Sequence, residues 1–163
     1  MLLHQISRKP VVKSKFTFNP GPAMPQTAQW TCSASATAHG LRGIGLDVSE
    51  WDIVDLLGPL NITPQHGLMR GDGTVLAQKI REHYGLNVHN QWIGWEEALQ
   101  IAGTRPMMLG GAVYYHWVSA IGSDGNFLYI ANSALGYKGV WDRISRTQWG
   151  ALGSWAAVII ELQ

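Results

Sequence analysis

The chain has little cysteine, little charge and no long apolar run, and each of these shortages excludes a class of protein. Its 163 residues include one cysteine, which excludes an intramolecular disulfide framework and a zinc site built on several thiolates. Charged residues make up 14% of the chain and the formal net charge is +1, whereas a general nucleic-acid binder usually has a strong basic excess. No apolar run approaches the roughly 18 residues needed to cross a bilayer. We therefore expect no nucleic-acid partner and no membrane partner.

The chain does have enough length and enough apolar residues for one packed domain. Hydrophobic residues make up 46% of the sequence, which is too many for a disordered segment. A chain of this length can bury a sizeable core without disulfides or metals. The counts of 19 glycines and 8 tryptophans are high and are typical of a loop-rich mixed fold rather than a helical bundle.

Basic residues gather at the N-terminus. Residues 1–25 contain four Lys and Arg side chains and no acidic one, a charge of +4, and the remaining chain has a charge of −3. Four prolines make this stretch irregular, so we interpret residues 1–25 as an arm and residues 26–163 as the domain. The arm is either a solvated segment or a docking element for a protein partner with an acidic surface. No signal peptide is recognisable, so we expect cytoplasmic synthesis, with release by lysis or packaging in a phage particle as open routes.

The first half of the domain has the pattern of helices. Small residues follow Thr31, and we expect a buried, central helix that carries Cys32 at its start and extends to Ile44. Ser49 and Asp52 form a capping-box pattern at the start of a second helix. The other elements expected in this half are a loop over 58–73, a helix over 74–84, a short strand over 86–88 and a helix over 95–102.

The second half has the pattern of strands separated by turn residues. The sequence Ser-Asp-Gly-Asn over residues 123–126 is a hairpin signal. The elements expected here are strands over 107–109, 112–121, 127–131, 140–144 and 155–162, with a short helix over 145–151. Helices followed by strands predict an α+β fold with an antiparallel sheet.

Cys32 is the first candidate functional residue. A helix N-terminus favours the thiolate, which is the reactive form of cysteine. A lone cysteine among small residues is also a common core residue, so its place at the helix start leaves both interpretations open.

His116 and Asn132 lie on two segments that the hairpin signal would pair. Folding the chain between residues 124 and 125 places residue 116 opposite about residue 133, so that Asn132 comes within reach of His116. A cysteine nucleophile needs a base, and the base needs a group that orients it. Acyl transfer also needs hydrogen-bond donors to the oxyanion, for which the backbone N–H of Cys32 and the side chain of Gln26 are candidates.

In these motifs the chain resembles the papain-like cysteine peptidases. The resemblance rests on Gln26 and Cys32 at the helix start, on His116 in Tyr-Tyr-His-Trp-Val, and on Asn132 in Ile-Ala-Asn-Ser. Over residues 26–163 the chain is similar to the compact bacterial and phage type, which includes the leader-processing peptidase domains of bacteriocin exporters. The resemblance implies a papain-like fold with Cys32 as nucleophile, His116 as base, Asn132 as the orienting residue and Gln26 as oxyanion donor.

The chain departs from that family pattern at two positions. Ser33 follows the nucleophile, where many relatives have Gly or Trp, and Asn132 stands where many compact relatives have Asp. An asparagine orients an imidazole without adding charge, so it stabilises the imidazolium less. Gln29 is a second candidate for the oxyanion donor.

The remaining candidates fit structural roles better. His39 lies seven residues after Cys32, about 10 Å away at 1.5 Å per residue, which is too far for the base. No set of His, Asp and Glu has metal-ligand spacing, and the turn over residues 71–74 lacks the lysine of a phosphate loop. We therefore expect no metal and no other cofactor. Trp30 and Trp117, beside Cys32 and His116, are candidate walls of a cleft.

These residues support two classes of function. The leading hypothesis is a cysteine peptidase or amidase that hydrolyses a peptide or amide bond through a thioester, for example a phage lysin or virion-associated peptidase acting on cell-wall peptide or protein. A CHAP-type amidase would use the same chemistry. The alternative is a catalytically inert papain-like scaffold that serves as a structural or interaction component of a larger particle.

Overall fold

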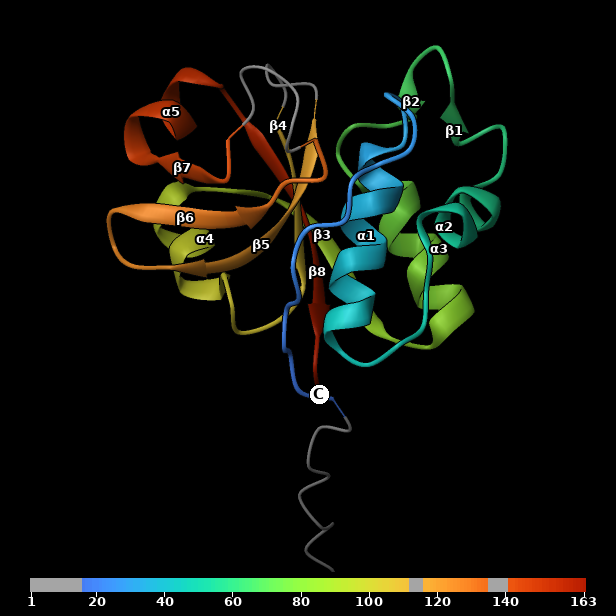
Figure 1. The fold of residues 1–163 in the computed structure, drawn as a ribbon, viewed down its shortest axis with the longest axis horizontal. Helices are drawn as coiled ribbons and strands as arrows, with labels where there is room; N and C mark the ends of the chain where they lie inside the picture. Colours follow the sequence, from blue (N-terminus) through green and yellow to red (C-terminus); the bar gives the residue numbers. More distant parts are fainter. Residues whose placement is uncertain (1–15, 112–115, 135–140) are drawn as a thin grey trace, which may run out of the picture.

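A six-stranded antiparallel sheet is the framework of the computed structural model, which describes residues 16–111, 116–134 and 141–163 (Figure 1). Its strands lie in the order β3-β8-β4-β5-β6-β7, and a separate hairpin pairs β1 with β2. The strands are β1 (Ile62–Thr63), β2 (Gly67–Leu68), β3 (Asn87–Ile93), β4 (Met107–Gly111), β5 (Trp117–Ser123), β6 (Phe127–Ala131), β7 (Arg143–Ser145) and β8 (Trp155–Glu161). The helices are α1 (Cys32–Gly43), α2 (Glu50–Leu57), α3 (Thr74–Tyr84), α4 (Trp95–Ile101) and α5 (Arg146–Ala151).

Strand β8 shows why helices lie on both faces of the sheet. Successive side chains of a strand point to opposite faces. One face of β8 contributes Ala156, Val158 and Ile160 to a core with α1, α2 and α3, and the other contributes Trp155, Ala157 and Ile159 to a core with α4 and α5. Burial on both faces accounts for the nearly continuous apolar sequence of this strand.

Helix α1 is buried between α2 and the sheet because its side chains are small. Ala34 and Ala38 are inaccessible to solvent, and the helix packs against β4 and β5. Helix α2 begins with the predicted capping box, in which Ser49 Oγ accepts from the Asp52 N–H and the Asp52 carboxylate accepts from the Ser49 N–H. The two helices together form one wall of the molecule, to the right of the sheet in Figure 1.

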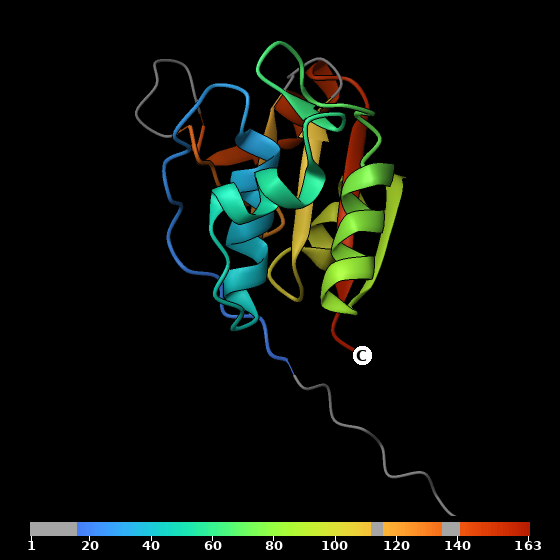
Figure 2. The same ribbon diagram turned by 90° about the vertical axis from the view of Figure 1, so that its right-hand side faces the viewer.

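The described part of the N-terminal segment, residues 16–25, runs alongside α1 (Figures 1 and 2). The Asn19 N–H donates to the Gly43 carbonyl at 2.7 Å, and a Cβ on Gly43 would lie 2.5 Å from the ring of Phe18. Nearer the start of α1, Ser35 Oγ contacts the Met24 carbonyl at 3.4 Å. These residues therefore pack against the domain, and the division of the chain at residue 25 stays a prediction.

The α+β class and the antiparallel sheet are confirmed, and most elements begin and end within two residues of the predicted bounds. The strand predicted over 86–88 is longer, Asn87–Ile93, because β3 is an edge strand whose polar middle residues hide the apolar alternation. The loop predicted over 58–73 contains the hairpin of β1 and β2, whose two-residue strands are too short to show a period. The strands predicted over 112–121 and 140–144 begin at Trp117 and Arg143, with residues 112–115 and 140 outside the described part.

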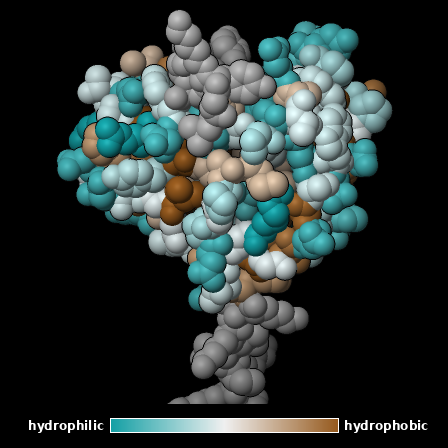
Figure 3. All heavy atoms as spheres, in the orientation of Figure 1, coloured by the Kyte–Doolittle hydropathy of each residue, from teal (hydrophilic) through white to brown (hydrophobic). Residues whose placement is uncertain are grey.

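The surface of the described part of the chain carries few large apolar side chains. The face in Figure 3 is mostly hydrophilic, with small separate apolar areas. Among the residues that the structure describes, the large apolar side chains that are exposed are those of Met24, Trp51, Leu60, Met69 and Trp92. Within the described residues, no helix combines the length and the apolar character needed to cross a membrane.

Candidate active site

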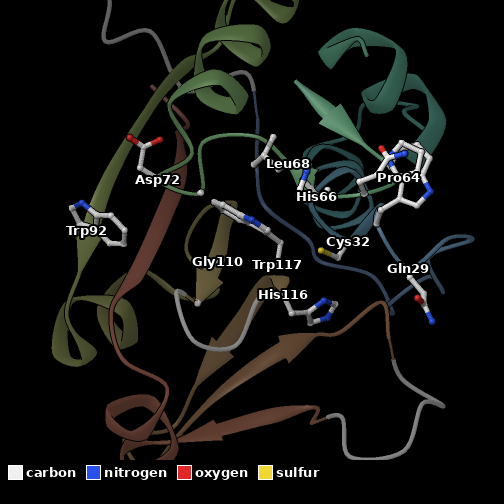
Figure 4. A pocket seen from close by; sticks show the side chains of 15 residues that line it. Gln29, Cys32, Pro64, His66, Leu68, Asp72, Trp92, Gly110, His116 and Trp117 are labelled. Carbon is white, nitrogen blue, oxygen red and sulfur yellow. The ribbon is translucent and has the colours of Figure 1, made fainter. Parts of the chain in front are cut away.

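Cys32 is the first residue of α1 and lines a pocket of about 540 Å³ (Figure 4). Its side chain is 9% exposed. The backbone N–H groups of Trp117, Ser33 and Cys32 itself interact with the sulfur and act to lower the thiol pKa. Burial acts more strongly in the opposite direction, because a thiolate is poorly solvated there, so that the pKa of the Cys32 thiol is raised.

His116 directly precedes β5 and lines the same pocket. The prediction that it lies within a strand is therefore wrong by one residue, since the ladder with β4 begins at the pair Trp117 and Gly110. The Trp117 N–H acts to lower the pKa of the Cys32 thiol, and His116, the residue before it, lines the same pocket as Cys32. Figure 4 shows Cys32 coming from α1 and His116 from the start of β5.

The Trp117 indole fixes this start of β5. It covers Gly110, where an added Cβ would lie 2.5 Å from the ring, and a Cβ added on Gly73 would lie 3.3 Å from the same indole. The missing side chain of Gly110 therefore makes room for the indole. This packing places the Trp117 N–H at the sulfur and His116 at the pocket.

Asn132 follows β6 and is fully buried. Its Oδ1 lies 2.7 Å from His116 Nε2, so the predicted reach across the hairpin is confirmed. The ladder pairs Ser119 with Ala131, and a register shift follows between Ala120 and Gly122. Burial lowers the pKa of His116, and the hydrogen bond to Asn132 acts in the opposite direction.

The two candidate oxyanion donors differ in their surroundings. Gln26 is buried, and its Nε2 donates to the carbonyls of Ala28 at 2.8 Å and Gln29 at 3.2 Å. Its Oε1 accepts from Ser133 Oγ at 2.8 Å. The side chain of Gln29 is exposed and lines the pocket. The roles of Cys32, His116, Asn132 and Gln26 themselves stay predictions.

The pocket also contains residues that the sequence did not single out. Pro64, Gln65 and His66, at the tip of the β1–β2 hairpin, line it, as do Trp92 and Asp72. Two-residue strands give no periodic signal, so nothing in the sequence placed this hairpin at the cleft. The predicted walls Trp30 and Trp117 do line the pocket.

His39 has the structural role predicted for it. It is buried, with Nδ1 at 2.8 Å from Ser119 Oγ on β5 and Nε2 at 2.7 Å from the Gly21 carbonyl. Residues 16–111, 116–134 and 141–163 contain no group of three or more His, Cys, Asp and Glu side chains placed to hold a metal ion.

Comparison with known proteins finds likeness in fold. No protein-family model matches the sequence, and no curated protein matches it. A double glycine motif protease from an AMS/PCAT transporter, solved with its leader peptide, is 20% identical with a TM-score of 0.65, over 91% of this chain and 99% of that one. The peptidase domain of Streptococcus ComA, a bifunctional ABC transporter, is 17% identical with a TM-score of 0.65, over 87% and 98%.

A third solved structure, a C39-like peptidase from Bacillus anthracis, is 13% identical with a TM-score of 0.59, over 90% of this chain and 98% of that one. These structures are matched over nearly their whole length. The chain therefore has the papain-like fold of the C39-type peptidase domains.

Proposed function

We propose that the chain is a cysteine peptidase in which Cys32 is the nucleophile, His116 the base and Asn132 the residue that orients the base. One observation carries the proposal: Cys32 and His116 line one pocket, and His116 Nε2 is hydrogen-bonded to Asn132 Oδ1 at 2.7 Å. This order of nucleophile, base and orienting group is what acyl transfer by a thiol requires. The fold shared with C39-type peptidases supports it.

The reaction begins with transfer of the Cys32 proton to His116 as the sulfur attacks the substrate carbonyl carbon. Burial raises the pKa of the thiol and lowers that of the imidazole, and both shifts favour the neutral thiol and the neutral imidazole in the resting site. His116 then acts as a general base during the attack, rather than as the partner of a preformed thiolate. The Cys32 N–H and the Gln29 amide are the donors we assign to the oxyanion, because Gln29 lines the pocket.

Collapse of the tetrahedral intermediate breaks the C–N bond, and His116 returns its proton to the leaving amine. The acyl group remains on Cys32 as a thioester. Water then attacks the thioester carbon, gives a proton to His116, and releases the acid while the sulfur regains the proton. Each cycle consumes one peptide bond and one water molecule and leaves the protein unchanged.

The substrate we assign is an extended peptide without a strong charge at the cleaved bond. Asp72 is the one Asp, Glu, Lys or Arg among the pocket-lining residues that the structure describes. The neighbour from the AMS/PCAT transporter was solved with its leader peptide, so a peptide with a double-glycine motif is the first probe. A cell-wall peptide is the second probe, since a phage lysin or virion-associated peptidase, released by lysis or packaged in the particle, would cleave it.

The test compares the wild-type chain with Cys32→Ser and His116→Ala on both probes, with products identified by mass spectrometry. We expect cleavage by the wild type and a loss of about 10²–10⁴-fold or more in kcat/KM for both variants at unchanged melting temperature. Full hydrolysis by Cys32→Ser would refute the mechanism.

The inert-scaffold hypothesis makes a different prediction for the thiol. An active Cys32 should react with a peptide carrying a thiol-directed electrophile much faster than with iodoacetamide, and only when His116 is present. Equal, slow reaction with both reagents and no cleavage of either probe would favour the scaffold, with the N-terminal arm as its docking element.

A further inference from the structure

Two main-chain groups fix the orientation of the Asn132 amide. Its Nδ2 donates to the Trp141 carbonyl at 2.6 Å, and its Oδ1 accepts from the Ala134 N–H at 3.1 Å. A main-chain carbonyl can only accept and a main-chain N–H can only donate, so exchange of the amide oxygen and nitrogen would break both bonds. The side chain is fully buried, where such a mismatch is costly.

This orientation determines the protonation of His116. Because Asn132 Oδ1 is an acceptor, the His116 Nε2 at 2.7 Å from it carries the hydrogen. In the neutral ring the unprotonated nitrogen is then Nδ1, which is the one able to take a proton during catalysis. The Trp141 carbonyl thus acts on His116 through Asn132.

The turn that carries Asn132 is also fixed on its other side. Ser133 Oγ donates to Gln26 Oε1 at 2.8 Å, and the Gln26 N–H donates to the Ser133 carbonyl at 3.0 Å. These two bonds join the residue after Asn132 to the segment that leads into Cys32. A small shift of the turn, which would relieve a mismatch at position 132, would therefore also disturb that segment.

We propose that the Trp141 carbonyl makes position 132 specific for an amide, so that Asn132 positions His116 by hydrogen bonding alone and an aspartate cannot replace it. The inference rests on the proposed function for its kinetic consequences, but its structural part does not depend on activity. Trp141 is a positioning residue, since it reaches the reacting atoms only through Asn132 and His116.

An ionised aspartate at position 132 would place a carboxylate oxygen against the Trp141 carbonyl oxygen, where Asn132 Nδ2 now donates. Two acceptors at that distance repel each other, and the buried carboxylate would lose a partner that water cannot replace. A protonated carboxyl could donate to the carbonyl as the amide does. The Asn132→Asp variant should therefore match the stability of the wild type only at acid pH, where the carboxyl is protonated.

The experiment uses the full chain with Asn132→Asp, Asn132→Ala and a matched control, Asn61→Asp. Asn61 Nδ2 donates to the Leu57 carbonyl at 2.7 Å, which is the same kind of contact as that between Asn132 Nδ2 and the Trp141 carbonyl. Asn61 is not among the residues that line the pocket. The readouts are the melting temperature from about pH 4 to about pH 8, across and above the ordinary carboxyl pKa, the ¹⁵N chemical shifts of His116, and the pH profiles of kcat and KM on the peptide that the wild type cleaves.

We expect the wild type to show His116 protonated at Nε2. Asn132→Asp should lose melting temperature relative to the wild type as the pH rises through the carboxyl range, and its kcat near pH 8 should fall at least about tenfold with little change in KM. Asn61→Asp should leave the His116 shifts and the shape of the kcat profile as in the wild type. Asn132→Ala should also have a lower kcat than the wild type. Its melting temperature relative to the wild type should not fall as the pH rises, because alanine has no carboxyl to ionise.

Two results would overturn the proposal: a wild-type His116 protonated at Nδ1, or an Asn132→Asp chain with wild-type melting temperature and kcat near pH 8. If the wild type cleaves no substrate, the proposed function fails. The histidine shifts and the melting temperatures then still decide whether position 132 is specific for an amide.

Discussion

The two walls of the cleft hold their functional residues in different ways. On the helical wall, Cys32 is placed by close packing of small side chains in α1 and by backbone N–H groups around its sulfur. On the sheet wall, His116 is placed by hydrogen bonds that run through Asn132 to the Trp141 carbonyl. Packing tolerates little change of volume, whereas a hydrogen-bond chain tolerates little change of donor and acceptor.

The difference implies different mutational behaviour. Substitutions on the helical wall should act mainly through size and stability, and those on the sheet wall mainly through donor and acceptor identity. Two links between the walls lie close to Cys32: the Trp117 N–H, which acts to lower the pKa of the Cys32 thiol, and the hydrogen bond between Gln26 and Ser133. Variants at or near these contacts test the comparison most directly.

Apart from the nucleophile and the base, the largest effect is expected for Gln29, which precedes α1 and lines the pocket. If Gln29 donates to the oxyanion, Gln29→Ala should lower kcat by about 10²–10³-fold with an unchanged melting temperature. Gln26→Ala should instead lower the melting temperature, because Gln26 joins Ala28, Gln29 and Ser133 by hydrogen bonds. Steady-state kinetics and thermal unfolding of both variants check this. A large loss of kcat in Gln26→Ala alone, with its melting temperature intact, would restore Gln26 as the donor.

The next prediction concerns the packing of the Trp117 indole over Gly110. In Gly110→Ala the new methyl group would lie 2.5 Å from the indole, so the ring must move or β4 and β5 must separate. We expect a loss of about 1–3 kcal/mol in the free energy of unfolding, together with a lower kcat because displacement of Trp117 also moves the adjacent His116. Urea unfolding and kinetics measure the two effects.

Gly150→Ala is the control for that substitution. Gly150 lies in α5 with open space around its Cα, so an alanine there should raise the free energy of unfolding by about 0.5–1 kcal/mol and leave kcat unchanged. Equal effects of the two substitutions on stability would contradict the role assigned to the Trp117 indole.

Much of this arrangement could be predicted from the sequence because the signals are local. The capping box at Ser49, the glycine after Tyr84 and the turn over residues 123–126 fix helix and hairpin bounds within a few residues. The hairpin turn also predicts that His116 and Asn132 meet, since pairing follows from the turn position.

The remaining features depend on contacts between distant segments. Nothing local in the sequence around Gln26 shows that Ser133 binds it, or that the Trp141 carbonyl receives the Asn132 amide. The β1–β2 hairpin at the pocket is likewise set by tertiary packing, because its strands are too short to have a period. Motif spacing therefore predicted the pairing of His116 with Asn132, but not the groups that orient that pair.

The smallest effect is expected at His39, which lies in α1 and contacts β5 and the segment of residues 16–25. Its Nε2 donates to the Gly21 carbonyl, and in the neutral ring Nδ1 accepts from Ser119 Oγ. Burial lowers the pKa of His39, and nearby Arg42 acts in the same direction, whereas the Gly21 carbonyl opposes them.

The sign of the pH effect follows from this lowered pKa. Above about pH 6.5, the ordinary histidine value, both states are neutral and His39 contributes its full stability. As the pH falls below that value the unfolded chain takes up a proton and the folded chain does not, so stability is lost until the folded-state pKa is reached.

His39→Gln should therefore melt below the wild type near pH 7.5, with a difference of about 2–4 °C that narrows near pH 5. His116 titrates in both chains, so the difference isolates His39. A difference that stays constant over this range would show that His39 does not hold the segment of residues 16–25 through a neutral ring.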